Sequence, residues 1–196
     1  MINGTLVEGV DWSGKTTLID KLYGDLNKLN TRVKKNKYYL TDNKITNYLV
    51  NQGDSLDVGE EQDVLFTLAT LFDIQSFEQE NTYILQDRHW LSIHAHNKFF
   101  YPNSYIAKAD MLKHNHLEFK YNIYLTSDLE EKVKRIQNQP PESGFDKYLA
   151  ENPHIHQSYD KFWINEIPSN ENWLIIDTTD KSKEQVEEES LRFILD

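Results

Sequence analysis

Short apolar runs and stretches of helical periodicity alternate along the chain. The apolar runs predict five strands, over residues 2–8, 32–40, 83–86, 119–125 and 173–177. Strands that alternate with helices are typical of a parallel sheet, because the connection between parallel strands is usually a helix. The pattern therefore predicts an α/β fold, a three-layer sandwich in which a five-stranded parallel sheet has helices on both faces.

Apolar residues at intervals of three and four predict the connecting helices. These are expected over residues 15–29, 44–50, 60–79, 90–100, 107–113, 155–164 and 183–195, with a further helix that a capping box at Ser127 and Glu130 would open and that would end near Gln137. The helix at 60–79 carries an apolar stripe that we expect to face the core, made of Val64, Leu65, Leu68, Leu71, Phe72 and Ile74.

A length of 196 residues suits a single domain with a sizeable core. Residues 139–144 contain two prolines and a glycine, which cannot continue a helix. We therefore expect one domain over residues 1–196, with a short mobile lid at about 136–150.

Composition excludes several classes of function. There is no apolar window of about 18 residues that could span a membrane and no basic, apolar leader at the N-terminus. The formal net charge of −11 argues against a broad nucleic-acid surface, although a few local cations could still hold a small phosphorylated substrate. No cysteine is present to form disulfides or thiolate metal sites.

The stretch from Gly9 to Thr17 fits G-x-x-x-x-G-K-[ST], the loop that wraps the phosphates of a nucleoside triphosphate. It lies between a predicted strand and a predicted helix, as that loop requires. Glycine lets the backbone approach an anion, the lysine contacts the β- and γ-phosphates, and the hydroxyl after it ligates Mg²⁺. The sequence thus predicts ATP and Mg²⁺ binding in the cytosol, with the nucleotide held by Gly9, Asp11, Trp12, Ser13, Gly14, Lys15, Thr16 and Thr17 and the metal by Thr16 and Asp87.

A second candidate site follows the third predicted strand, at Asp87 and Arg88. A carboxylate there can hold Mg²⁺ or accept a proton, and an arginine offers a fork for phosphate. A solvated strand end with an ordinary ion pair is the alternative. Asp11 in the loop would repel a triphosphate, so we expect it on the acceptor side, and Asp42 after the second strand is a weaker candidate.

Phosphoryl transfer also needs cations at the transferred group, which the lid could supply. Lys132, Lys134 and Arg135 lead into it, with a solvated helix face as the alternative. Aromatic residues at helical spacing are more often core than base-stacking platforms. The histidines occur in pairs two residues apart, which does not fit a zinc site on a helix.

On these residues, the chain resembles the thymidylate kinase family of P-loop nucleoside-monophosphate kinases. Residues 8–17 match the pattern Glu-Gly-x-Asp-x-Ser-Gly-Lys-Thr-Thr, and residues 87–97 are similar to Asp-Arg-Tyr-x-x-Ser-x-x-Ala-Tyr-Gln. The resemblance implies transfer of the ATP γ-phosphate to a nucleotide 5′-phosphate by a homodimer. It implies that Asp11 and Arg88 contact the acceptor and that Ser92 and Asn97 line the base pocket. With the candidates above, the predicted catalytic residues are Lys15, Asp87, Arg88, Asp11 and Arg135, and the predicted acceptor site is Asp11, Asp42, Phe66, Thr70, Arg88, Ser92 and Asn97.

The chain departs from the family at the acceptor site. Thr70 stands where the family has an arginine that holds the base, and Thr46 where an arginine reaches the acceptor phosphate. Trp12 follows Asp11 where some members carry a catalytic arginine, so the resemblance assigns that charge to Lys134 or Arg135. A dianionic acceptor is normally held by several cations.

Three functions are compatible with these residues. The first is a kinase for nucleoside monophosphates such as dTMP. The second is a nucleoside kinase, in which Asp42 or Asp87 deprotonates a hydroxyl. The third is a nucleotide-binding module that transfers no phosphate to a small acceptor.

Overall fold

The computed structural model describes residues 1–29, 31–57, 59–139 and 144–196. One sheet contains β1 (Ile2–Glu8), β2 (Val33–Lys37), β3 (Tyr83–Asp87), β4 (Phe119–Thr126) and β5 (Trp173–Asp177). All of its pairs are parallel, in the order β2-β3-β1-β4-β5. The helices are α1 (Lys15–Lys28), α2 (Lys44–Asp54), α3 (Glu60–Ser76), α4 (Trp90–Phe100), α5 (Tyr105–Ala109), α6 (Met111–Asn115), α7 (Leu129–Asn138), α8 (Gly144–Glu151), α9 (Pro153–Glu166) and α10 (Lys183–Leu195). The predicted fold class is confirmed.

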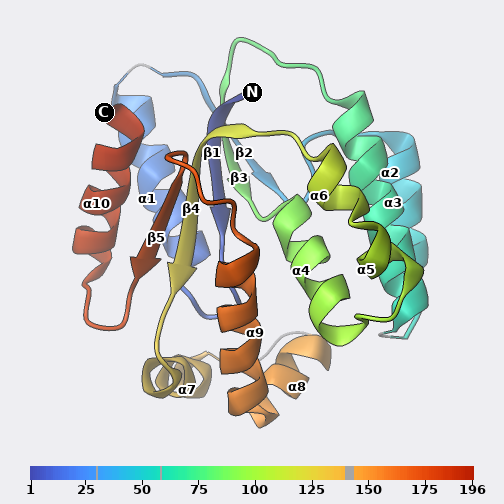
Figure 1. The fold of residues 1–196 in the computed structure, drawn as a ribbon. Helices are drawn as coiled ribbons and strands as arrows, with labels where there is room; N and C mark the ends of the chain where they lie inside the picture. Colours follow the sequence, from blue (N-terminus) through green and yellow to red (C-terminus); the bar gives the residue numbers. More distant parts are fainter. Residues whose placement is uncertain (30, 58, 140–143) are drawn as a thin grey trace.

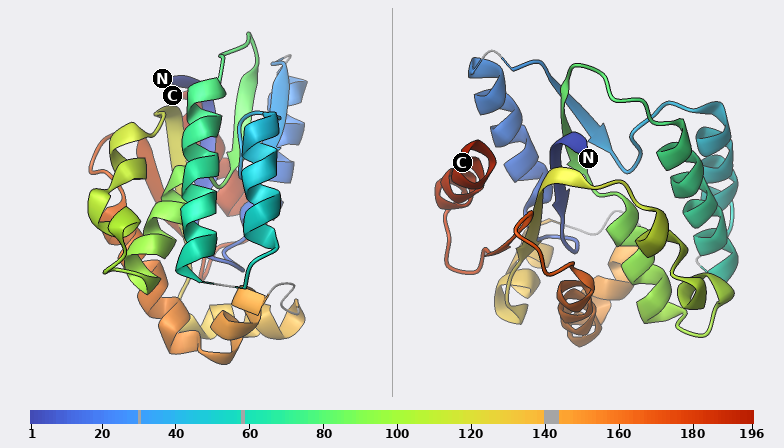
Figure 2. Two further views of the ribbon diagram at one scale, coloured as in Figure 1. Left: turned by 90° about the vertical axis from the view of Figure 1, so that its right-hand side faces the viewer. Right: turned by 45° about the horizontal axis from the view of Figure 1, so that its top comes forward.

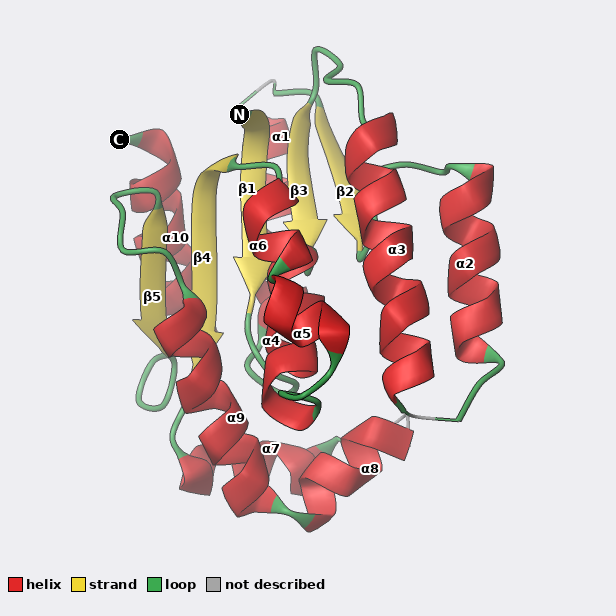
Figure 3. Ribbon diagram, turned by 45° about the vertical axis from the view of Figure 1, so that its right-hand side comes forward, coloured by secondary structure: helices red, strands yellow, loops and turns green. Residues whose placement is uncertain are grey.

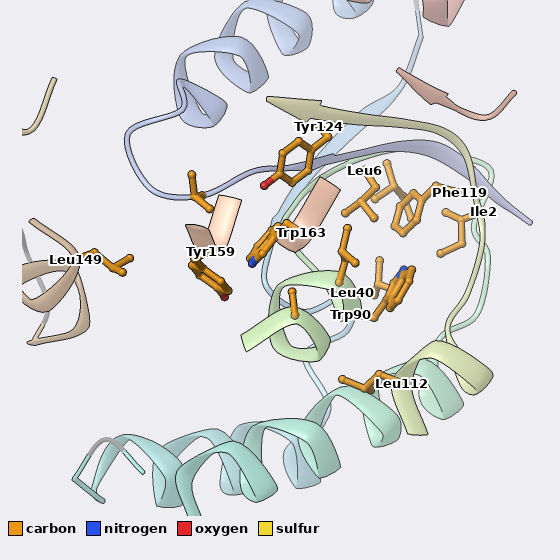
Figure 4. Close-up of a cluster of buried hydrophobic side chains, with 14 residues drawn as sticks. Ile2, Leu6, Leu40, Trp90, Leu112, Phe119, Tyr124, Leu149, Tyr159 and Trp163 are labelled. Carbon is orange, nitrogen blue, oxygen red and sulfur yellow. The ribbon is translucent and has the colours of Figure 1, made fainter. Parts of the chain in front are cut away.

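Two apolar layers hold the sheet between helices (Figure 1; Figure 3). On one face, α1 and α10 cover a core that includes Val7, Leu22 and Ile123. The other core contains Leu6, Trp90 and residues of α9. Figure 4 shows Tyr159 and Trp163 close together in this second core. No described helix is long and apolar enough to cross a membrane.

The carboxyl ends of the strands all point toward α7, α8 and α9 (Figure 3). The sheet therefore ends at an edge that these three helices cover, whereas α2 and α3 stand side by side along a different flank (Figure 2, left). In open parallel sheets, ligands bind beyond the carboxyl ends of the strands, so we expect the ligand site at this edge.

The second strand is shorter than predicted, and its end is diverted by a buried carboxylate. Strand pairing stops at Lys37, and Tyr38 takes a left-handed backbone with φ 64°. Asp73 of α3 then accepts hydrogen bonds from the backbone N–H groups of Leu40 and Thr41, at 2.7 and 2.8 Å. These bonds replace the ladder that a strand over residues 32–40 would need.

The prediction that α3 presents its apolar stripe to the core was wrong. Its buried residues are mostly polar: Asp63, Thr67, Ala69, Thr70 and Asp73. The stripe is only partly buried, and Phe72 is 38% exposed. The buried side chains instead bond to neighbouring elements, as when Asn97 Nδ2 donates to Thr67 Oγ1 at 2.9 Å.

Other boundaries also differ from expectation. The helix predicted over 107–113 is two short helices, broken at Asp110, where φ is 48°. Asp128, not Ser127, caps α7, because its side chain accepts from the Glu131 N–H. The described part of the expected lid is helical from Gly144 onward, while 140–143 lie outside the described residues. The caps of α10 form a complete capping box between Ser182 and Gln185.

Candidate active site

The loop between β1 and α1 turns on two glycines that no other residue could replace without strain. Gly9 has φ 144°, and a Cβ there would lie 2.5 Å from the Leu125 carbonyl oxygen. Gly14 has φ 100° and lies directly before the first residue of α1. The first N–H groups of a helix lack intrahelical partners. The loop therefore delivers an exposed helix N-terminus, with its favourable dipole, to the carboxyl edge of the sheet.

Lys15 lies buried against this loop and donates from Nζ to the Val10 carbonyl oxygen at 2.9 Å. Burial, followed by the nearby Arg88 guanidinium, lowers the pKa of Lys15 to about 8. A bound anion would relieve both effects, since it would add a negative partner to the ammonium group. The loop is thus electrostatically prepared for a phosphate.

Arg88 and Asp11 form an ion pair at the same edge, between the turn after β3 and the phosphate loop. Burial disfavours the charged form of Arg88, but Asp11, Tyr38, Glu8 and Asp87 together outweigh it and keep the pKa of the guanidinium raised. Burial acts to raise the pKa of Asp11, but Arg88, Lys15 and His156 together hold it below its usual value. The Arg88 backbone is left-handed, with φ 60°, and its N–H donates to Val7 O at 3.0 Å.

Glu8 holds the Arg88 turn in place, a role that sequence analysis missed. Its carboxylate is fully buried and accepts from the His89 N–H at 2.9 Å and from Ser92 Oγ at 2.7 Å. Burial raises the pKa of Glu8, although both hydrogen bonds and Arg88 act to lower it. The only sequence signal was that Glu8 precedes the phosphate loop in the family pattern.

Asp87 and Thr16 provide the oxygen atoms that a magnesium site needs. Asp87 Oδ1 is buried with no hydrogen-bond partner among the described residues, and Thr16 is exposed in the first turn of α1. Mg²⁺ prefers such oxygen ligands and often uses one carboxylate together with substrate phosphates. The described part of the chain holds no cluster of three or more His, Asp or Glu side chains that could bind a metal alone.

A cavity of about 940 Å³ extends from the phosphate loop to the helices beyond the sheet. It is lined by Asp11, Trp12, Gly14, Lys15, Thr16, Thr17, Lys37, Tyr38, Tyr39, Val50, Asp54, Gln62, Asp63, Phe66, Asp87, Arg88, His89, Ser92, Ile93, His96, Gln139, Phe145, Asp146, Tyr159 and Trp163. One end is the loop, and the other is rich in aromatic side chains. This arrangement can hold a polyphosphate beside a second, planar ligand.

Most predicted site residues line this cavity, but six do not: Gly9, Ser13, Asp42, Thr70, Asn97 and Arg135. Gly9 and Ser13 belong to the phosphate loop itself, and Ser13 is buried. Asp42 lies on the surface and accepts from Asn47 Nδ2 at 2.6 Å. Thr70 is buried and donates to the Phe66 carbonyl at 2.9 Å, and Asn97 is buried against Thr67. Thr70 and Asn97, which the family resemblance suggested, are therefore buried outside the cavity lining.

The expected lid cations lie outside the lining of this cavity. Lys132 is fully buried in a network with Asp160 and the Ser127 carbonyl, which anchors α7 to α9. Arg135 donates from Nε to Glu131 and from both other nitrogens to Thr178, and also to the Trp12 carbonyl at 3.1 Å. Lys134 is 70% exposed and pairs with Glu131 at 3.3 Å.

A parallel sheet whose first loop presents a buried lysine and a helix N-terminus to a cavity defines a P-loop nucleotide-binding fold. A sequence profile of the thymidylate kinase family matches residues 7–190. Among solved structures, the chain is similar to thymidylate kinase from Candida albicans, described as having broad substrate specificity. That likeness has a TM-score of 0.70 at 19% identity and covers 99% of this chain and 91% of the other. No curated protein sequence matches.

The chain therefore belongs to the thymidylate kinase family, as the resemblance predicted. It is a nucleotide kinase, an enzyme that transfers a phosphoryl group.

Proposed function

We propose that this protein works in the cytosol and transfers the γ-phosphate of ATP to the 5′-phosphate of a nucleoside monophosphate such as dTMP. The observation that carries the proposal is the Arg88–Asp11 ion pair, which lines the same cavity as Lys15. A phosphate-binding loop and a second, separate phosphate-binding fork in one cavity suit a reaction between two phosphorylated ligands.

On the donor side, the loop N–H groups and Lys15 would bind the β- and γ-phosphates. Lys15 would exchange its bond to Val10 O for a phosphate oxygen, because an anion is a stronger partner than a carbonyl. A magnesium ion held by Thr16 and Asp87 would neutralise charge on these phosphates.

On the acceptor side, Arg88 would bind the monophosphate with its planar fork. Asp11 keeps this guanidinium paired before the acceptor arrives. When the acceptor's phosphate takes the place of Asp11 on Arg88, the Asp11 carboxylate would become available to hydrogen-bond the acceptor's sugar. The base would stack among the aromatic side chains at the far end, where Phe66, Phe145 and Tyr159 line the cavity. Ser92 stays bonded to Glu8 and supports this wall.

Between the two sides, Trp12 links the loop to the lid. Its indole Nε1 donates to the Gln139 carbonyl oxygen at 3.1 Å, and its own carbonyl accepts from Arg135. Through this link, Arg135 would steady the loop in the closed site and help to exclude water.

A nucleoside kinase is the second candidate, and one observation favours it. Thr46 and Thr70, which occupy the places of two family arginines, are both fully buried and lie outside the cavity lining. A site with fewer cations suits an uncharged acceptor, with Asp87, whose Oδ1 has no hydrogen-bond partner among the described residues, as the base.

An acceptor panel separates these functions. ADP release is measured with ATP and Mg²⁺ against nucleosides and their 5′-monophosphates, and we expect kcat/KM for the best monophosphate to exceed that for its nucleoside by at least about 100-fold. Arg88→Lys keeps the charge but loses the fork, so it should raise the monophosphate KM and leave the ATP KM unchanged. Turnover of nucleosides alone would favour the second candidate, and nucleotide binding without any transfer would refute both.

We also propose that the protein is a homodimer joined through α2 and α3. Apolar side chains are exposed on both helices, with Ile45 at 50% and Tyr48 at 62% in addition to Phe72. Contiguous exposed apolar surface commonly marks an interface. Light scattering should give twice the chain mass for the wild type and the chain mass for Phe72→Asp. The control Tyr105→Asp changes an 80% exposed tyrosine on α5 and should leave the dimer intact.

A further inference from the structure

Lys37 is a cation of the cavity that forms no ion pair with a carboxylate of the described residues. The described residues that line the cavity include three lysine or arginine side chains: Lys15, Lys37 and Arg88. Lys15 is bonded to Val10 O and Arg88 is paired with Asp11. The Lys37 side chain is exposed, with Nζ 5.1 Å from the centroid of the Tyr38 ring, and it makes no ion pair or side-chain hydrogen bond with the part of the chain that the structure describes. An unpaired cation beside a site is notable in a chain with a net charge of −11.

The sheet places Lys37 directly beside the Asp87–Arg88 turn. Lys37 at the end of β2 is the register partner of Asp87 at the end of β3. Register partners in a sheet project to the same face, so Lys37 and Asp87 lie on one side of the carboxyl edge. Tyr38, the next residue, also bonds to the β3 end, because its N–H donates to the Asp87 carbonyl oxygen at 2.9 Å.

Backbone strain at Tyr38 gives a second, independent indication. Among the described residues, four non-glycine positions have positive φ, namely Trp12, Tyr38, Arg88 and Asp110. The first three line the same cavity. A left-handed backbone is unfavourable for these side chains and is kept mainly where function or surrounding structure requires it. The chain is therefore bent at Tyr38 in a way that keeps Lys37 at the cavity, and Asp73 holds the residues that follow.

A phosphate monoester carries nearly two negative charges, and one guanidinium does not neutralise it. The two further cations expected from the family pattern are absent, because Thr46 and Thr70 stand in their places and are buried. We propose that Lys37 binds the acceptor's phosphate together with Arg88 and thereby selects a nucleoside monophosphate over the nucleoside. This inference rests on the proposed function and names the residue that gives that site its preference.

The test is calorimetric titration of the purified protein with dTMP and with thymidine, in the absence of a phosphoryl donor. Lys37→Met removes the charge and keeps most of the side-chain length. It should weaken dTMP binding by about 10- to 100-fold, the range for one charge-assisted hydrogen bond, and change thymidine binding by less than about twofold. Lys37→Arg should restore most of the dTMP affinity, because it restores the charge.

Lys34→Met is the matched control, since Lys34 is exposed on the same strand but does not line this cavity. It should bind both ligands like the wild type. Equal dTMP affinity in Lys37→Met and the wild type, or an equal loss of dTMP and thymidine binding, would overturn the inference while leaving the proposed function standing. A wild type that neither binds nor phosphorylates any nucleoside monophosphate would instead overturn the proposed function, and the inference with it.

Discussion

The two ends of the cavity are built in different ways. The donor end is a contiguous stretch, residues 9–17, whose glycines and lysine act through local backbone geometry. The acceptor end collects side chains from β2, α2, α3, α4, α8 and α9, far apart in sequence. A local loop can be recognised from its residues, whereas an assembled wall depends on which face each helix turns inward.

The helices that support the two ends show the same contrast. Helix α1 follows the phosphate loop and buries an apolar side that contains Leu18, Leu22 and Leu26. Helix α3 supports the acceptor end and buries Asp63 and Asp73 instead. Polar groups inside a fold must find partners, so α3 fixes neighbouring loops in specific positions at the expense of apolar burial.

The largest effect should come from the donor end. Lys15→Met removes the charge that contacts the transferred group, and kcat/KM should fall by about 10³-fold. The fold should not suffer, because burial already disfavours the ammonium group in the empty site. Steady-state kinetics measures the fall in kcat/KM, and thermal melting measures whether the fold is kept. Near-normal turnover, or a protein that no longer folds, would contradict the assignment of Lys15.

At the acceptor end, Asp73→Ala tests whether polar burial holds the wall. It would leave the Leu40 and Thr41 N–H groups without their acceptor, together with the Thr41 hydroxyl that donates at 2.6 Å. We expect the free energy of unfolding to drop by about 3 kcal/mol and the acceptor KM to rise more than the ATP KM. Urea unfolding measures the loss of unfolding free energy. The control is Asp42→Ala at an exposed position, which should lower the free energy of unfolding by less than about 0.5 kcal/mol.

The pH dependence of nucleotide binding gives an intermediate effect. With the pKa of Lys15 at about 8, the empty site loses its ammonium charge as pH rises through that value. The affinity for ADP should then be constant below about pH 7 and fall by up to about tenfold per unit above pH 8. Lys15→Arg remains charged throughout, so its calorimetric affinity should stay flat, and a parallel decline in both proteins would point to another group.

The smallest effect compares a glycine of α2 at the acceptor end with a glycine of α1 at the donor end. A Cβ on Gly53 would lie 2.6 Å from Cε1 of Phe66, which lines the acceptor end. Gly53→Ala should displace this ring and raise the acceptor KM about threefold, while alanine's better helix propensity, about 1 kcal/mol, protects the fold. Gly24→Ala in α1 meets nothing within 4 Å and should leave both KM values unchanged.

Sequence reasoning succeeded where a signal is local. The strands β1, β3, β4 and β5 and the helices α1, α4 and α10 lie within a residue or so of their predicted positions. Periodicity failed for α3, because the partners of Asp73 and Thr67 come from distant segments. The same limit applies to Lys132, for which the sequence left a lid cation and a solvated helix face open, whereas the structure buries it beside Asp160.

The sequence by itself determined the sheet, the phosphate loop and the Asp87–Arg88 turn, since glycine geometry and strand patterning act over a few residues. Only the tertiary structure decided which side chains meet the acceptor. It placed Lys37 and Tyr38 at the cavity, moved Thr70 and Asn97 behind its wall, and made Glu8 the support of Arg88. The physical reason is that a buried polar group must be paired, and its partner is chosen by packing across the whole chain.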